Sequence, residues 1–100
     1  MDVAGIRSLL YSVKYLKDKD GLKRFGERVK MHRLARGFSQ EGLAYESGLS
    51  YSHINRIERG ELNAGLSTVF MLARTLEVEL KDLFDFPLPP LEADQANASE

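Results

Sequence analysis

The stretch QEGLAYESGLSYSHINRIER, residues 40–59, decides the fold. It contains two short segments with the apolar spacing of helices, separated by a turn with Gly48 at its centre. Glycine adopts a positive φ without a steric penalty from a Cβ atom, so Gly48 permits a sharp reversal of the chain. Ala44 is small, which lets two helix backbones cross closely. The stretch therefore predicts a helix-turn-helix unit made from residues 40–47 and 50–59.

The second of these helices is predicted to have an apolar side and a polar side. A helix has 3.6 residues per turn, so placing Ile54 and Ile57 inward, with Leu43 and Leu49, turns another set of side chains outward. That outward set is polar, with an aromatic residue at its edge: Ser52, Asn55, Arg56, Arg59 and, at the edge, Tyr51. Amide and guanidinium groups on one helix face are suited to base edges or phosphates of duplex DNA.

Further helices are predicted on both sides of this unit. The apolar spacing indicates helices at residues 22–36, 66–76 and 79–84, and an additional N-terminal helix at residues 3–17 that KDKDG, residues 17–21, brings to an end. Three prolines from Pro87 onward stop helix formation, and no stretch alternates as a strand does. We therefore expect an all-α fold: a compact five-helix domain with the additional N-terminal helix.

Three regions are expected along the chain. Residues 1–20 form a helical N-terminal extension, residues 21–86 form the helix-turn-helix domain, and residues 87–100 form an acidic, disordered tail. The amphipathic extension has two interpretations that the residues leave open. It is either a packing helix of the same domain or a surface for a dimer or another partner.

The charge of the chain is segregated. The net charge is −1 and the pI about 6.1, which by themselves do not favour binding to a polyanion. However, residues 22–60 carry a net charge of +4, residues 61–100 carry −6, and residues 1–21 carry +1. A local basic region is what an electrostatic footprint on DNA requires.

Several classes of function are not expected. The 100 residues include no Cys, which excludes disulfides and thiolate metal sites, and His32 and His53 lack companion ligands. No combination of nucleophile, base and orienting group is present, so we expect neither an enzyme nor a cofactor. No apolar run reaches the length of a membrane span, so we expect a cytoplasmic protein without membrane contact.

Residues 25–84 resemble the phage repressor and Cro family of bacterial regulators, the XRE type. The resemblance is carried by FGERV at residues 25–29, Arg33, GFSQEGLA at residues 37–44, SGLSYSHINRIERGELN at residues 47–63, and LARTLEV at residues 72–78. It implies that residues 50–59 form a recognition helix that lies in the major groove. Two positions depart from the family pattern: Ala64 stands where a proline is usual, and Tyr51 where a short polar residue is common.

The resemblance also implies roles for single residues. Arg33 and Glu58 match a pair that forms a buried salt bridge in the family. Gln40, at a helix N-terminus, and Asn63, in the loop after the recognition helix, match contacts to the DNA backbone. The DNA-binding set expected from both lines of argument is Gln40, Ser50, Tyr51, Ser52, Asn55, Arg56, Arg59 and Asn63.

The predicted function is sequence-specific regulation of transcription, by repression. The protein would bind a palindromic operator in double-stranded DNA as a homodimer. Residues 66–84 are predicted to form the dimer interface, because one small domain leaves part of an apolar set uncovered: Val69, Phe70, Leu80, Leu83 and Phe84. The alternative is a protein-interaction module, such as an antitoxin or co-regulator, with secondary DNA binding. A co-purifying protein partner would favour that alternative.

Overall fold

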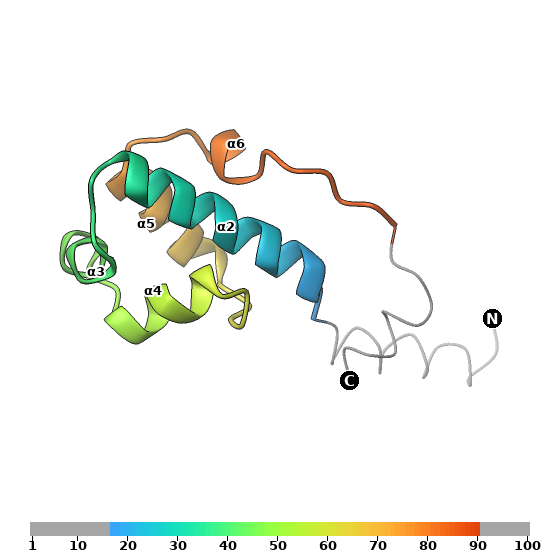
Figure 1. Cartoon of the computed structure of the whole chain (residues 1–100), viewed down its shortest axis with the longest axis horizontal. Helices are drawn as coiled ribbons and strands as arrows, with labels where there is room; N and C mark the ends of the chain where they lie inside the picture. The colour runs from blue at the N-terminus through green and yellow to red at the C-terminus, as the bar shows by residue number, and fades with distance from the viewer. Residues whose placement is uncertain (1–16, 91–100) are drawn as a thin grey trace.

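The computed structural model describes residues 17–90, and within them it contains five helices and no strand. In chain order these are α2 (Lys19–Ala35), α3 (Gln40–Ser47), α4 (Tyr51–Glu58), α5 (Leu66–Leu76) and α6 (Leu80–Leu83). In Figure 1 the long helix α2 crosses the molecule, with α4 below it, α5 behind it and α6 above it. The predicted all-α fold is confirmed for these residues. The N-terminal helix predicted at residues 3–17 falls, apart from Lys17, outside them, as do residues 91–100 of the tail.

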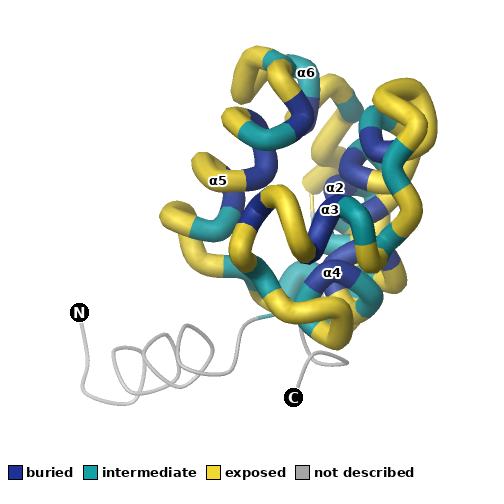
Figure 2. The backbone as a smooth tube through the Cα atoms, turned by 90° about the vertical axis from the view of Figure 1, so that its left-hand side faces the viewer, coloured by how far each residue is buried: buried dark blue, intermediate teal, exposed yellow. Residues whose placement is uncertain are grey.

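One core joins the helices, and Figure 2 shows its buried positions on their inward sides. Seven side chains are almost fully buried: Val29, Leu43, Ile54, Ile57, Leu72, Leu76 and Leu83. Of the apolar set that was expected to stay partly uncovered, Val69 and Leu83 are buried within the domain, at 5% and 0% exposure. The other three members of the set, Phe70, Leu80 and Phe84, are exposed. None of the helices within residues 17–90 has the length and apolar character that crossing a bilayer requires.

Helix α2 begins earlier than the sequence pattern predicts. KDKDG was expected to end a preceding helix, but Asp18 is the N-cap of α2, and its Oδ1 accepts a hydrogen bond of 2.9 Å from the amide of Gly21. An N-cap carboxylate satisfies one of the free amides of the first turn, and Asp20 adds negative charge at the positive end of the helix. The domain boundary expected after residue 20 therefore falls inside α2.

Gly26 allows α2 and α4 to pack closely. A Cβ atom at this position would lie 2.7 Å from the carbonyl oxygen of Glu58 and closer still to that of Ile57. Real Cβ atoms do not occupy such positions without movement of the neighbouring backbone. The absence of a side chain at Gly26 thus sets the distance between the long helix and the end of α4.

Candidate nucleic-acid interface

The turn between α3 and α4 has the geometry that its sequence predicts. Gly48 is left-handed, with φ 78°, and its amide donates to the carbonyl oxygen of Ala44 at 2.9 Å. Ser50 is the N-cap of α4, and its hydroxyl accepts from the amide of His53 at 3.0 Å. Ser47, which the sequence argument did not single out, is buried, and its Oγ accepts from the amide of Leu49 at 3.2 Å. These bonds set the direction in which α4 leaves the turn.

A buried ion pair connects α2 to the end of α4. Arg33 donates through Nε to Glu58 Oε2 at 2.6 Å and through Nη2 to Glu58 Oε1 at 3.0 Å. The two side chains are only 8% and 3% exposed. The third guanidinium nitrogen, Nη1, donates to the carbonyl oxygen of Phe38 at 2.9 Å. The pair that the resemblance implied is therefore present as a bidentate contact, which orients both partners more strictly than a single bond does.

Gln40 and Asn55, both predicted to contact DNA, bond to each other. Gln40 Nε2 donates to Glu58 Oε1 at 3.0 Å, and Gln40 Oε1 accepts from Asn55 Nδ2 at 3.2 Å. Both residues are half-buried, so the expectation of a fully outward Asn55 does not hold. Each amide side chain already uses both of its polar ends within the protein, because Asn55 Oδ1 also accepts from Arg59 at 3.1 Å. A network thus runs from the core ion pair to the surface of α4.

The two arginines of α4 and its C-cap differ in their surroundings. Arg59 bonds Asn55 and forms an ion pair with Glu61, whose Oε1 lies 2.6 Å from Nη2. The Arg56 side chain is exposed and makes no hydrogen bond or ion pair with any other residue between 17 and 90. Its guanidinium therefore keeps all five donors for a ligand.

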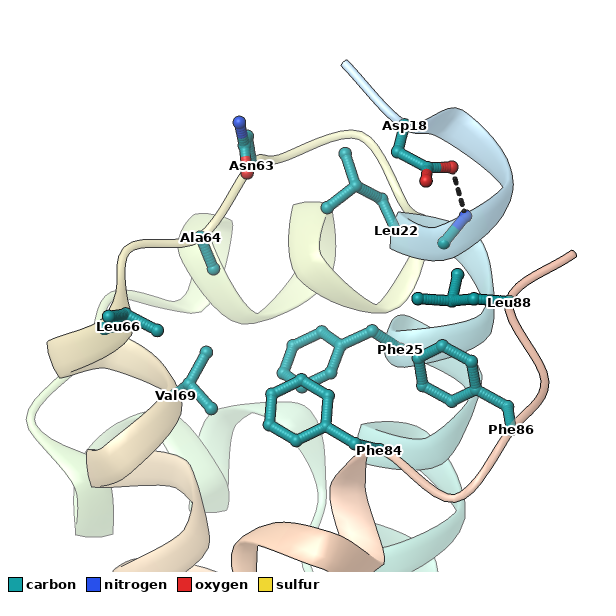
Figure 3. A pocket seen from close by; sticks show the side chains of 11 residues that line it. Asp18, Leu22, Phe25, Asn63, Ala64, Leu66, Val69, Phe84, Phe86 and Leu88 are labelled. Carbon is teal, nitrogen blue, oxygen red and sulfur yellow. Dashed lines mark hydrogen bonds between the residues drawn. The ribbon is translucent and has the colours of Figure 1, made fainter. Parts of the chain in front are cut away.

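The remaining predicted residues lie on the surface, in two places. Ser50, Tyr51 and Ser52 are exposed at the start of α4, and Tyr51 is 48% exposed. Asn63 is exposed in the loop between α4 and α5, beyond the other end of α4, and Figure 3 shows it at the rim of an apolar pocket. The predicted set therefore occupies the start, the outer face and the loop beyond α4, with Gln40 beside them from α3.

Much of the basic charge of residues 22–60 is compensated within the fold. Arg24 pairs with Asp20 and Arg36 with Glu77, and both of these acids lie outside residues 22–60. Arg28 is half-buried and donates from Nε and Nη2 to the carbonyl oxygen of Asp82, at 2.9 and 2.8 Å. The net charge of +4 thus overstates the positive field that this region offers to DNA. Sequence spacing could not reveal the contact between Arg28 and Asp82, because the two residues are 54 positions apart in the chain.

Known proteins similar to this chain are helix-turn-helix regulators. Residues 29–83 match the family HTH_3, helix-turn-helix, which spans from within α2 to the end of α6. The control protein C.BamHI of Bacillus amyloliquefaciens is 41% identical over 63 residues, which are 62% of this chain and 78% of that protein.

Two solved structures are similar in fold and in sequence. The restriction-modification controller protein C.AhdI from Aeromonas hydrophila has a TM-score of 0.62 and 43% identity, over 63% of this chain and 96% of its own. The controller protein C.Esp1396I, solved as a tetramer with its natural 35 base-pair operator, has a TM-score of 0.59 and 33% identity, over 64% of this chain and 84% of its own. The chain belongs to the helix-turn-helix family of DNA-binding transcriptional regulators, of the XRE type.

Proposed function

We propose that this protein represses transcription by placing α4 in the major groove of a specific operator. The observation that carries the proposal is the contrast between the two sides of α4. Its inner side is held by the core residues Ile54 and Ile57 and by the buried Arg33–Glu58 pair, while its outer side presents an uncompensated Arg56. A rigidly held helix with a free guanidinium is suited to bidentate hydrogen bonding with guanine.

The roles proposed for the other residues follow their positions. Tyr51 and Ser52, exposed near Arg56, contact bases or the thymine methyl group. Ser50, Asn63 and Arg59 contact the DNA backbone from the two ends of α4. Gln40 and Asn55 act as a bonded unit: Gln40 orients the amide of Asn55, which keeps one donor hydrogen and one acceptor lone pair for an adenine.

We propose a homodimer through the C-terminal helices. Phe70 and Leu80 are 38% and 41% exposed, and they line a hollow of about 230 Å³ with Ala73, Arg74 and Val78. An exposed apolar surface of this kind on a small domain indicates an interface. A twofold dimer would place two copies of α4 about 34–36 Å apart, in successive major grooves.

The function proposed is binding rather than catalysis, in the cytoplasm where the DNA lies. Occupation of a promoter by the dimer would exclude the polymerase from it. The relatives named above are controllers, and one of them binds its operator as a tetramer.

Selection of bound duplexes from a random-sequence pool, at two salt concentrations, tests the proposal. Recovery of a palindrome with half-sites about 10 base pairs apart would support a dimeric, sequence-specific regulator. Retention of DNA without an enriched motif would contradict specificity, since phosphate contacts alone carry no sequence information. No retention even at low salt would favour the protein-interaction alternative instead.

A further inference from the structure

An apolar groove of about 390 Å³ lies on the side of the domain where the described chain begins. Figure 3 shows its walls: α2, the loop between α4 and α5, the start of α5, and the segment after α6. Phe25 and Phe84 stack in it, with ring centroids 5.4 Å apart. Leu66 and Leu88 line it while remaining 69% and 63% exposed. Apolar surface on this scale is costly to leave in water.

Residues 1–16 meet the domain beside this groove. Lys17 Nζ donates to the carbonyl oxygen of Glu61 at 2.9 Å, which ties the start of the described chain to the loop that forms one wall. Asp18 and Leu22 themselves line the groove. The point from which the preceding segment leaves the domain is therefore beside the groove.

The composition of residues 1–16 fits such a groove. Large aliphatic residues recur in this segment with helical spacing, at Ile6, Leu9, Leu10, Val13 and Leu16. The other segment outside the described residues, 91–100, has Leu91 as its one large aliphatic residue and carries three acids. An apolar stripe on a short helix is stabilised by packing more than by helix propensity, so it needs a surface to cover.

We propose that residues 1–16 fold back as an amphipathic helix and pack, within the same molecule, into the groove lined by Phe25, Phe84 and Leu88. Leu16 and Val13 are the apolar side chains nearest to Lys17 in the chain, and they occupy the part of the groove closest to it. This surface is distinct from the outer face of α4 and from the hollow beside Phe70, so the proposal goes beyond DNA binding and dimerisation. It resolves the two interpretations of the extension in favour of a packing helix.

Paramagnetic relaxation in the full-length chain tests this placement. The protein has no Cys, so Ser8→Cys, on the side of the helix away from the apolar stripe, accepts a single nitroxide label. Protein carrying both the nitroxide and nitrogen-15 is diluted with an excess of unlabelled protein, so that only intramolecular effects are seen. We expect strong signal loss at the amides of Leu66 and Leu88, and none at Leu34, which is exposed on α2 away from the groove.

A second sample distinguishes a second copy of the chain as occupant. Nitroxide-labelled protein without nitrogen-15 is mixed with nitrogen-15 protein without nitroxide. Signal loss at Leu66 and Leu88 in this mixture alone would overturn the proposal, because the segment would then cover another molecule. Absence of signal loss in both samples would overturn it as well.

Thermal unfolding of paired variants supplies an independent measurement. Leu88→Asp and Val13→Asp should each lower Tm by roughly 4 °C, and the double variant by no more than either alone, because each removes the same contact. Leu34 is about as exposed as Leu88, so Leu34→Gln, which adds no charge at the C-terminal end of α2, serves as the control together with Ser12→Asp in the segment, and both should leave Tm nearly unchanged. Additive losses in the double variant would show that the two positions do not interact.

Discussion

At the scale of single residues, Glu58 accepts hydrogen bonds from both Arg33 and Gln40, in a site closed to solvent. Glu58→Gln removes the compensating charge and leaves the Arg33 guanidinium buried without a counterion. We expect the free energy of unfolding to fall by about 3–5 kcal/mol, because removing one partner of a buried pair leaves the other uncompensated. Urea denaturation measures this, with the exposed Glu46→Gln as a control expected within about 0.5 kcal/mol of the parent. Equal midpoints for the two variants would mean that water reaches the pair.

Arg56 is the residue on which the base contact is predicted to depend. Arg56→Ala should weaken binding to the selected operator by roughly 1–3 kcal/mol, and binding to random duplex by much less. Lys30→Ala removes the same charge from α2, on an exposed side chain outside the proposed dimer interface, and controls for the change in net charge. Titrations of all three proteins on both duplexes measure the difference. An equal loss on the two duplexes would reduce Arg56 to a phosphate contact.

At the scale of helices, two physical effects of replacing Gly26 by alanine oppose each other. Alanine is favoured over glycine inside a helix by about 1 kcal/mol. The Cβ of Gly26→Ala would nevertheless press on the backbone at the end of α4, and overpacking typically costs about 1–3 kcal/mol. We expect a net loss of stability, which chemical denaturation would detect. Gly42→Ala is the comparison, because its Cβ meets only side-chain atoms, at 3.1 Å or more, and a stability above that of Gly26→Ala is expected.

The bounds of the helices show which features the sequence predicts and which it does not. The predicted bounds of α3 and α5 agree with the structure, and α4 differs only at its ends, because caps and glycines at Ser39, Gly48 and Ser50 act through neighbours in the chain. The start of α2 is missed because DKDG can end one helix or begin another, and local pattern does not distinguish these. Within the apolar set of residues 66–84, the pattern did not tell the buried Val69 and Leu83 from the exposed Phe70, Leu80 and Phe84, because periodicity shows which face is apolar and not which neighbour covers it.

The candidate site shows a similar division between local and long-range information. The exposed positions of Tyr51, Ser52 and Arg56 follow from helix geometry once Ile54 and Ile57 are placed inward. The bond between Gln40 and Asn55 does not, because it depends on how α3 and α4 pack and on side-chain rotamers. The residues proposed to contact DNA are therefore predictions from exposure and from family resemblance, and the operator titrations above test Arg56 directly.

At the scale of the whole molecule, dimerisation should control operator binding. An aspartate at Leu80, which lines the hollow beside Phe70 and is 41% exposed, would place a charge in the proposed interface. We expect Leu80→Asp to sediment as a monomer at concentrations where the parent is a dimer, while keeping its helical circular dichroism, since Leu80 lies outside the buried core.

The same variant connects assembly to recognition. A monomer engages one half-site, so it forgoes the gain in effective concentration that a second, linked half-site provides. Affinity of Leu80→Asp for a full palindrome should fall toward its affinity for a single half-site, whereas the parent should bind the palindrome far more tightly. Leu34→Asp, an equally drastic change at an exposed leucine of α2, should leave both sedimentation and affinity unchanged. If Leu80→Asp stays dimeric, the interface lies elsewhere on the molecule; if it is monomeric yet binds the palindrome as tightly as the parent, recognition does not require the dimer.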